Sequence, residues 1–429
     1  MLRTTTMSAA ALLGVTLLAP AGAATAAVTC QGQVATITGP NDAYGFLTGT
    51  DGDDVIVTDG VDYVDALGGN DLICITGGSV VDLDAGAGND SVDATLFGGF
   101  TDLGPGSDRY VGSADRDQVA AGSGAYRQDA ERDVIDTGPR GDYQDYVWSG
   151  HEGDANSDDV RMGWGSLYWS GHATAASVVE GGADSWLLYS PEAGTVRIDN
   201  SDGTLEAGRQ PVLRVPGFVR YYIGYEPGLD HVIFRGSSRD EVVSVGYGRT
   251  LVRSTIDLRG GDDELVVNAR DERKGSSYEA GRGQDFLNLS SGTDDLDLDL
   301  RRGRLSTGKG KKEITLKATG FEDVQLKARD IELVGTDGPN DIELHGCRLA
   351  VNARGGKDDV STFVQGPDAG PIICRERRMT ADGGRGNDTL EGTSGRDVLI
   401  GGPGRDTADG RERRDTCRAE SRTSCEVRR

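Results

Sequence analysis

The sequence is poor in the residues that build thick hydrophobic cores and in positive charge. Apolar residues make up 36% and aromatic residues 6% of its 429 residues, and 45 basic residues face 70 acidic ones, for a net charge of −25. Proteins that bind nucleic acid need basic surface to neutralise phosphates, so this balance excludes that class. Two classes remain: a disordered acidic chain, or a fold whose carboxylates are neutralised by metal cations.

Long apolar runs are also missing. After residue 26, no segment approaches the ~20 apolar residues that a transmembrane helix requires. Ala9–Leu18 is too short to span a bilayer; it follows Arg3 and precedes the small-residue sequence Ala24-Thr25-Ala26, and a second candidate cleavage site follows Ala21-Gly22-Ala23. This pattern predicts a secretory signal peptide at residues 1–26 and a secreted, extracellular protein without a transmembrane segment.

Catalytic motifs are scarce. The segment beginning His151-Glu152 lacks the second histidine of a HExxH zinc motif, and none of the four histidines lies at a zinc-binding spacing from another. The nearest approach to GxSxG, at Gly392–Gly395, has the wrong spacing. We therefore expect a protein that is not an enzyme.

Glycine is abundant, and at residues 383–410 it recurs with a period of nine. The chain there reads GGRGNDTLE, GTSGRDVLI and GGPGRDTAD, with Asp in the sixth place of each unit. Glycine permits the tight positive-φ turns that expose backbone carbonyls, and Asp adds a carboxylate, so stacked turns offer the oxygen ligands that Ca²⁺ prefers. The predicted ligand positions are Gly384, Gly386, Asp388, Gly395, Asp397, Gly402, Gly404 and Asp406.

A similar series lies near the N-terminus, where the acids are 17, 19 and 18 residues apart, about twice the unit length. Each acid has Gly two positions before it and an apolar residue or Tyr two positions after it. In a two-sided coil, eighteen residues return the chain above itself, so these loops should stack along one edge while the opposite edge has largely lost its Asp. The predicted positions are Gly52, Asp54, Gly69, Asp71, Gly88, Asp90, Gly106 and Asp108.

Short alternating strands and the nine-residue repeat together predict an all-β parallel solenoid of the β-roll or β-helix type, stabilised coil against coil. Looser Gly-Asp turns recur at Asp263, Asp285 and Asp358. The predicted segments are a signal peptide at 1–26, an N-terminal solenoid at 27–136, an irregular aromatic-rich β section at 137–235, a degenerate solenoid at 236–378, nonapeptide repeats at 379–410 and a basic, disulfide-closed C-terminal cap at 411–429.

These motifs resemble the bacterial RTX (hemolysin-type) calcium-binding repeats, and the C-terminal tail resembles those of small secreted actinobacterial members. The resemblance is carried by residues 383–410 and, less perfectly, 49–119. It implies that two loops one coil apart share each Ca²⁺ through Asp carboxylates and backbone carbonyls, and that several ions bind. The implied groups are Asp388 with Asp406, and the ladder Asp54, Asp71, Asp90 and Asp108.

One loop departs from this pattern. Asp397 should pair with Asp415, but Arg413 occupies the place where a positive-φ glycine is wanted, and that backbone conformation is unfavourable for a residue with a side chain. The prediction is therefore that the Asp397 site is compromised and that the N-terminal ladder holds more of the calcium. We expect calcium to stabilise the fold, or to trigger folding after export.

The cysteine count is even, which in an exported chain predicts disulfides. Six cysteines allow fifteen connectivities, and proximity in sequence favours Cys417–Cys425, with Cys347–Cys374 and Cys30–Cys74 as weaker choices.

Two alternative functions remain open. Aromatic residues gather between 143 and 225, including all four tryptophans, and could bind glycans or a surface, although they could equally fill an irregular core. The second alternative is a calcium-dependent β-helix polysaccharide lyase, with Arg235, Arg239 and Arg253 near Asp240 forming a cleft. Solvated charges on a strand are the simpler interpretation of those arginines.

Overall fold

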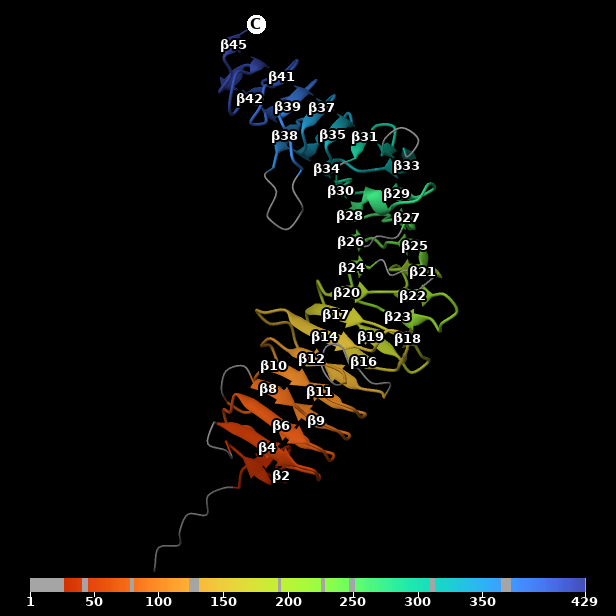
Figure 1. Ribbon diagram of the computed structural model, residues 1–429, viewed down its shortest axis with the longest axis vertical. Helices are drawn as coiled ribbons and strands as arrows, with labels where there is room; N and C mark the ends of the chain where they lie inside the picture. The colour runs from red at the N-terminus through yellow and green to blue at the C-terminus, as the bar shows by residue number, and fades with distance from the viewer. Residues whose placement is uncertain are drawn as a thin grey trace, which may run out of the picture.

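The computed structural model describes residues 27–40, 45–77, 81–122, 131–191, 194–224, 228–246, 251–292, 294–308, 313–363 and 372–428. The predicted signal peptide and Tyr225 lie outside these ranges. Within them the chain winds into an elongated, bent stack of coils that climbs from β2 at one end to β45 at the other (Figure 1). Nearly all strand pairs are parallel and join strands one coil apart, so the predicted all-β parallel solenoid is confirmed.

One sheet, here called the shared sheet, runs along the whole stack. Its strands, in pairing order, are β4 (Phe46–Thr50), β6 (Tyr63–Leu67), β8 (Val81–Asp84), β10 (Gly99–Asp102), β12 (Gln118–Ala120), β14 (Asp145–Ser149), β17 (Gly165–Trp169), β20 (Trp186–Tyr189), β24 (Arg220–Ile223), β26 (Val242–Val245), β28 (Glu264–Asn268), β30 (Phe286–Ser290), β34 (Asp323–Lys327), β36 (Asp341–His345), β38 (Asp359–Thr362), β40 (Thr389–Glu391), β42 (Thr407–Asp409) and β44 (Ser421–Thr423).

The other side of each coil belongs to one of two sheets. The N-terminal sheet contains β3 (Ile37–Thr38), β5 (Val55–Val57), β7 (Leu72–Cys74), β9 (Ser91–Asp93), β11 (Arg109–Val111), β13 (Val134–Asp136), β16 (Asp159–Arg161) and β19 (Val178–Glu180). The C-terminal sheet contains β23 (Leu213–Arg214), β22 (Thr204–Ala207), β21 (Gly194–Asp199), β25 (Leu229–Arg235), β27 (Arg253–Asp257), β29 (Ser277–Glu279), β33 (Ile314–Thr319), β32 (Arg304–Thr307), β31 (Asp295–Asp299), β35 (Asp330–Val334), β37 (Arg348–Asn352), β39 (Arg378–Asp382), β41 (Val398–Ile400), β43 (Thr416–Arg418) and β45 (Val427–Arg428).

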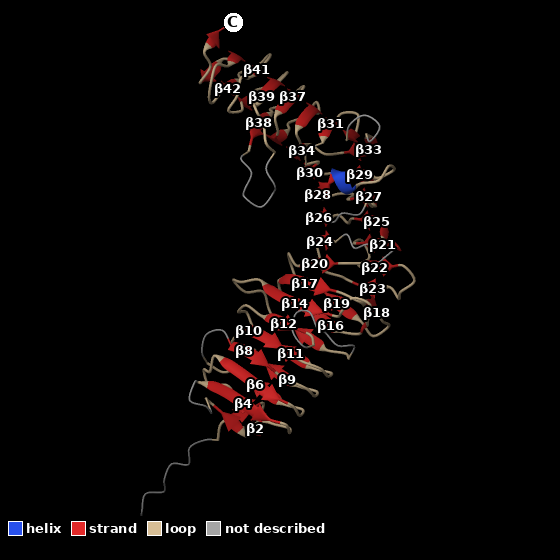
Figure 2. Ribbon diagram, viewed as in Figure 1, coloured by secondary structure: helices blue, strands red, loops and turns tan. Residues whose placement is uncertain are grey.

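Three small elements complete the described chain. The pairs β1 (Thr29–Cys30) with β2 (Gln33–Val34), and β15 (Ala155–Asn156) with β18 (His172–Ala173), form separate two-stranded sheets. The only helix in the described ranges is the short 3₁₀ turn η1 (Ala269–Asp271), seen beside β29 in Figure 2. No helix in the described residues is long and apolar enough to cross a membrane.

The core consists of columns of inward side chains, because every second strand residue faces inward. In the N-terminal sheet, Ile56, Ile73, Val92 and Tyr110 align in register, and each is at most 1% exposed. These are the residues two places after the ladder acids. Each coil therefore buries only a thin apolar layer, which explains how a chain with so few apolar residues folds.

The solenoid continues through the aromatic-rich section, where β14, β17, β20 and β24 pair in parallel. Large side chains such as Trp169 and Phe218 are buried here. The regular coil is interrupted twice by antiparallel excursions, at β21–β22–β23 and at β31–β32–β33. The first excursion lies where the N-terminal sheet ends and the C-terminal sheet begins.

The three cysteine pairings favoured by proximity are all present. The Cα atoms lie 5.5 Å apart in Cys30–Cys74, 5.4 Å in Cys347–Cys374 and 5.8 Å in Cys417–Cys425.

Candidate metal sites between stacked loops

The loop acids stack along the coil edge in ladders that the backbone itself joins. In the N-terminal ladder, the main-chain N–H of each acid donates to the carboxylate Oδ1 of the acid one coil later. The N···O distances are 2.8 Å from Asp54 to Asp71, 2.8 Å from Asp71 to Asp90 and 2.7 Å from Asp90 to Asp108. The structure thus brings together the four acids that sequence spacing had placed on one edge.

The C-terminal repeats form the same contact. Asp388 N lies 3.0 Å from Asp406 Oδ1, as the nonapeptide spacing predicted, and Asp358 N lies 3.0 Å from Asp388 Oδ1. The looser turns at Asp263 and Asp285 are joined likewise, at 3.0 Å. These acids precede strands of the shared sheet, whereas the N-terminal ladder precedes strands of the N-terminal sheet, so the ladder changes edge along the stack.

Sequence reasoning missed the continuation of the N-terminal ladder. Asp108 N donates to Asp133 at 2.8 Å, and Asp133 N donates to Asp158 at 3.0 Å. Both steps span 25 residues, and no glycine precedes either acid by two positions, so period and motif both fail there. The sequence feature that these two acids still share with the other ladder acids is an apolar residue two places later, which faces inward.

The ladder acids are buried, and many keep one carboxylate oxygen without a hydrogen-bond donor. Oδ1 accepts the backbone N–H, but within the described residues no donor reaches Oδ2 of the acids named at the end of this paragraph. Each is at most 2% exposed. An unsatisfied buried carboxylate oxygen is costly, so these atoms indicate the position of a cation. The acids are Asp71, Asp90, Asp263, Asp285, Asp358, Asp388, Asp406 and Asp415.

Electrostatics support the same conclusion. Burial raises the pKa of Asp71 to about 6 and those of Asp90, Asp263 and Asp358 to about 7, and neighbouring ladder carboxylates add to the rise in each case. A positive ion is the group that would reverse this penalty.

Backbone oxygens approach the same edge. We number each nonapeptide unit from one, with the ladder acid sixth; the fourth place then holds Gly88, Gly386 or their equivalents. A Cβ built on Gly88 would lie 1.7 Å from Gly69 O, and one on Gly386 would lie 1.4 Å from Gly356 O. Both glycines have φ of +143°, which other residues avoid. At these two positions only glycine leaves room for the carbonyl of the adjacent coil.

A cation here would need those carbonyls. Within the described residues, no three His, Cys, Asp or Glu side chains gather into a metal-binding cluster. Calcium accepts carbonyl oxygens together with carboxylates, so the donor set fits Ca²⁺ and does not fit a site built from side chains alone.

Not every predicted site has this geometry. At Asp54, the N–H and the hydroxyl of Thr50 donate to Oδ2 at 2.9 and 2.8 Å. At Asp397, Thr393 N donates to Oδ2 at 2.6 Å. These two acids are already satisfied by protein donors, although the ladder contact from Asp397 N to Asp415 Oδ1 is present at 2.8 Å.

The backbone strain expected at Arg413 is present, with φ of 72°, but it does not prevent Asp415 from stacking on Asp397. The feature that distinguishes the Asp397 loop is Thr393, whose N–H and hydroxyl both donate to the Asp397 carboxylate.

The arginines of the lyase alternative are each engaged elsewhere. Arg235 pairs with Asp199 at 3.3 Å, Arg239 donates to the Phe218 carbonyl at 2.9 Å, and Arg253 donates to the Gly275 carbonyl at 3.0 Å. Each guanidinium therefore ties strands and loops together.

The aromatic residues divide into two groups. Trp169 and Tyr221 are buried in the core. Tyr146, Trp148 and Tyr168 are half-buried on the outer face of the shared sheet and stack, with ring centroids 6.2 Å apart for the first pair and 5.5 Å for the second.

Comparison with known proteins agrees with this geometry. A family model for the RTX calcium-binding nonapeptide repeat, in four copies, matches residues 46–73, 102–125 and 382–416. No curated protein matches the chain. The matched segments contain the first loops of the N-terminal ladder and the last open loops of the C-terminal one, so the chain carries RTX-type calcium-binding repeats near both ends of its solenoid.

Proposed function

We propose that Ca²⁺ bound along the carboxylate ladders holds the ends of the solenoid together, and that the exported chain folds, or completes its folding, when it meets calcium. The observation that carries this proposal is the row of buried carboxylate oxygens without donors. Extracellular calcium modules work at Kd of ~10⁻⁴–10⁻³ M, which suits a protein that folds after export.

Backbone N–H groups, glycines and carboxylates of the chain have different roles in the proposed sites. The ladder N–H groups fix one oxygen of each carboxylate, so the other is held in place before any ion arrives. The fourth-place glycines let carbonyl oxygens of adjacent coils approach that oxygen. Bound calcium would neutralise carboxylates that otherwise repel one another along the edge. Loops with this geometry are proposed as the ligands, with Asp71, Asp90 and Asp108 at one end and Asp358, Asp388 and Asp406 at the other.

The direct test is a calcium titration of the chelator-treated protein, followed by far-UV circular dichroism, with calorimetry to count the ions. Strand signal should rise with calcium to a plateau, and magnesium should serve poorly as a substitute. An unchanged spectrum in excess chelator, together with no calorimetric binding at millimolar calcium, would rule the proposal out.

A second function is favoured by the outward aromatic row. Tyr146, Trp148 and Tyr168 expose stacked rings along neighbouring strands, and Arg220 lies over Trp186 with its guanidinium carbon 5.7 Å from the ring centroid. Flat aromatic faces in a row suit the apolar faces of sugar rings. We infer an extracellular glycan as the partner of this surface.

Tryptophan fluorescence tests the glycan proposal. Soluble cell-wall or host polysaccharides should quench the emission, and Trp148→Ala should remove most of the change. The buried Trp169 provides an internal reference in the same protein. No quenching across a broad panel would contradict this role and leave the calcium proposal untouched.

A further inference from the structure

Thirteen loops of the described chain fall into two conformations, and the residue in the second place separates them. The loops of Asp145 and Asp158, whose second-place residues Gly141 and Asp154 have neither a positive φ nor a hydroxyl, belong to neither group. In the loops whose acids keep a carboxylate oxygen without a donor, here called open loops, the second-place residue has φ between 62° and 116°. These residues are Leu67, Gly86, Arg259, Gly281, Arg354, Gly384, Gly402 and Arg411.

In five other loops of the described chain the second place holds Ser or Thr. Its main-chain N–H donates to the sixth-place side chain, and its hydroxyl accepts the N–H of the fourth-place residue. The donations to the sixth place are Thr50 to Asp54 at 2.9 Å, Ser113 to Asp117 at 3.0 Å, Ser237 to Glu241 at 2.9 Å, Thr336 to Asn340 at 2.8 Å and Thr393 to Asp397 at 2.6 Å. The hydroxyl contacts range from 2.9 to 3.2 Å. We call these closed loops.

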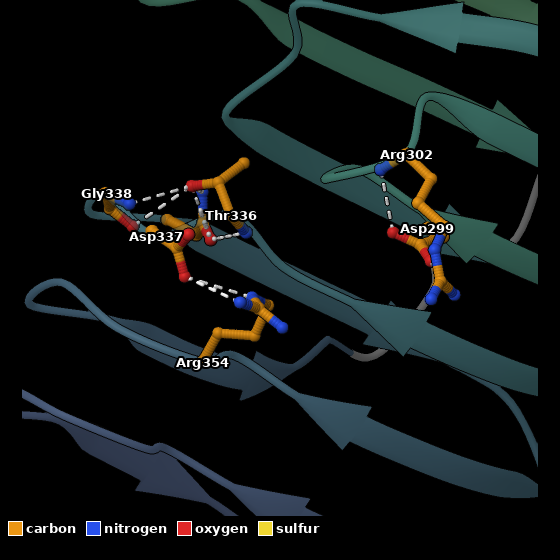
Figure 3. Close-up of polar contacts among 7 residues, drawn as sticks. Asp299, Arg302, Thr336, Asp337, Gly338 and Arg354 are labelled. Carbon is orange, nitrogen blue, oxygen red and sulfur yellow. Dashed lines mark hydrogen bonds and ion pairs between the residues drawn. The ribbon is translucent and has the colours of Figure 1, made fainter.

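We infer that Ser or Thr in the second place closes a loop to calcium, and that each closed loop caps the N-terminal end of a carboxylate ladder. This inference rests on the proposed calcium function and specifies which loops carry it out. Figure 3 shows one closed loop, in which Thr336 contacts Gly338, while Asp337 points outward to Arg354 of the next coil.

The cause is the direction of one peptide N–H. A left-handed second residue directs its N–H out of the loop: Gly86 donates to Asp84 at 3.1 Å and Gly384 donates to the Gly401 carbonyl at 2.9 Å. In a closed loop the same N–H points inward and occupies the oxygen that an ion would take. Thr is β-branched and disfavours left-handed φ, and the hydroxyls of Ser and Thr hold the inward conformation, which Leu, Arg and Gly in the second place cannot do.

The closed loops also share a position relative to the ladders. Each closed loop donates its sixth-place N–H to an acid of the next coil: Asp54 to Asp71, Asp117 to Asp145, Glu241 to Asp263, Asn340 to Asp358 and Asp397 to Asp415.

In each of these five pairs the closed loop is the first member. Its own side chain is satisfied by other donors, such as the Thr36 hydroxyl at Asp54, at 3.0 Å, and the Tyr110 hydroxyl at Asp117, at 2.7 Å. Among the described residues, the loops of Asp54, Asp117, Glu241 and Asp397 accept no ladder contact from an acid of the coil before, so no shared ion site is completed there and local donors replace the metal. Asn340 instead separates two runs of ladder contacts: Glu322, one coil before it, accepts the Asp285 N–H at 3.0 Å, and the neutral amide of Asn340 stands where the open loops hold a carboxylate.

The test exchanges the two conformations in neighbouring loops of the purified protein. Gly384→Thr converts GGRGND to GTRGND, the closed pattern, and should lower the calorimetric calcium stoichiometry by one ion. Gly384→Arg is the matched control, because arginine already occupies the second place of three open loops, at residues 259, 354 and 411; it should retain that ion. Thr393→Gly should instead open its loop, and Thr393→Ser should behave as wild type.

Stability in chelator provides a readout independent of calcium. Gly384→Thr should then unfold at a higher temperature than Gly384→Arg, because its buried carboxylate gains protein donors, whereas Thr393→Gly should unfold at a lower temperature than Thr393→Ser. Equal stoichiometry and equal unfolding temperatures within both pairs would overturn the inference. If the wild type binds no calcium but the chelator differences appear, the proposed function fails and the two loop conformations stand.

Discussion

The buried acids at the two ends of the solenoid and those in its middle have different surroundings. At the ends, buried acids keep oxygens without donors and lie in glycine-rich loops. In the middle, residues 131–224, comparable acids are satisfied by side chains: Ser149 donates to Asp158 at 2.6 Å, and Arg132 and Arg161 both lie 3.1 Å from Asp159. A buried acid of this solenoid thus either accepts hydrogen bonds from side chains or keeps an oxygen without a donor, where we propose that calcium binds.

The two regions also differ in where tryptophan and cysteine occur. The middle section contains all four tryptophans and fills its coils with bulk, such as Trp169 and Phe218, both at most 1% exposed. The ends also bury large aromatic residues, among them Tyr110, Phe234, Tyr278 and Phe321, but they contain no tryptophan and leave carboxylates stacked on one another. All three disulfides also lie outside the middle, which contains no cysteine. The disulfides therefore restrain only the ends, which is also where the proposed calcium would bind.

Removal of calcium with a chelator should have the largest effect on the difference between the ends and the middle. Excess chelator is expected to remove much of the strand signal in far-UV circular dichroism while leaving tryptophan emission nearly native, because every tryptophan lies in the middle. Readdition of calcium should restore the strands. A loss of both signals together would show that the middle also depends on the metal.

Disulfide removal should distinguish one end from the other. Cys30–Cys74 closes a separation of 44 residues and Cys417–Cys425 one of 8, so loop entropy predicts losses of roughly 4 and roughly 2.5 kcal/mol respectively. Urea unfolding of the two paired Cys→Ser variants in saturating calcium measures this. Equal losses would mean that residual structure in the unfolded chain, and not loop length, sets the effect.

Substitution of a single ladder acid should change the stability of the protein in opposite directions in chelator and in calcium. Asp90→Asn keeps a carbonyl oxygen for the Asp71 N–H but removes a buried charge. We expect a gain of about 1–3 kcal/mol in chelator and a loss of similar size in calcium. The control is Asp53→Asn on the exposed side of the same edge, where Asn70 already stands one coil later; it should change little. A shift of the same sign in both conditions would contradict the ligand role.

A pH slope is expected at Asp117, which lies outside the open loops. Burial raises the pKa of Asp117 to about 7, although Tyr110 and Ser113 donate to its carboxylate. The folded state then holds this proton more tightly than the unfolded one, so stability falls as pH rises from about 4 to about 7 and is level above.

Asp117→Asn should flatten that slope relative to wild type in saturating calcium, and Asp115→Asn, an exposed neighbour, should not. Denaturant midpoints measured at half-unit intervals of pH would show the difference. Parallel slopes for wild type and Asp117→Asn would mean that other groups control this dependence.

Sequence spacing was sufficient to predict the stacking of Asp54, Asp71, Asp90 and Asp108, because a regular eighteen-residue coil converts periodicity directly into contact. It was insufficient at Asp133 and Asp158, where wider coils break the period. The central section was also undecidable from sequence, since aromatic residues suit either a core or a binding face, and the structure uses them for both.

The sequence by itself determined the fold class and the edge on which the acids of each regular run would stack, and proximity along the chain favoured, without fixing, the three disulfide pairs. These are local properties of a repeat, in which each coil contacts its immediate neighbours. Only the tertiary structure decided which carboxylates are left without donors. That outcome depends on the direction in which the N–H of the second-place residue points and on whether a ladder loop lies in the coil before. The glycine-aspartate motif specifies neither.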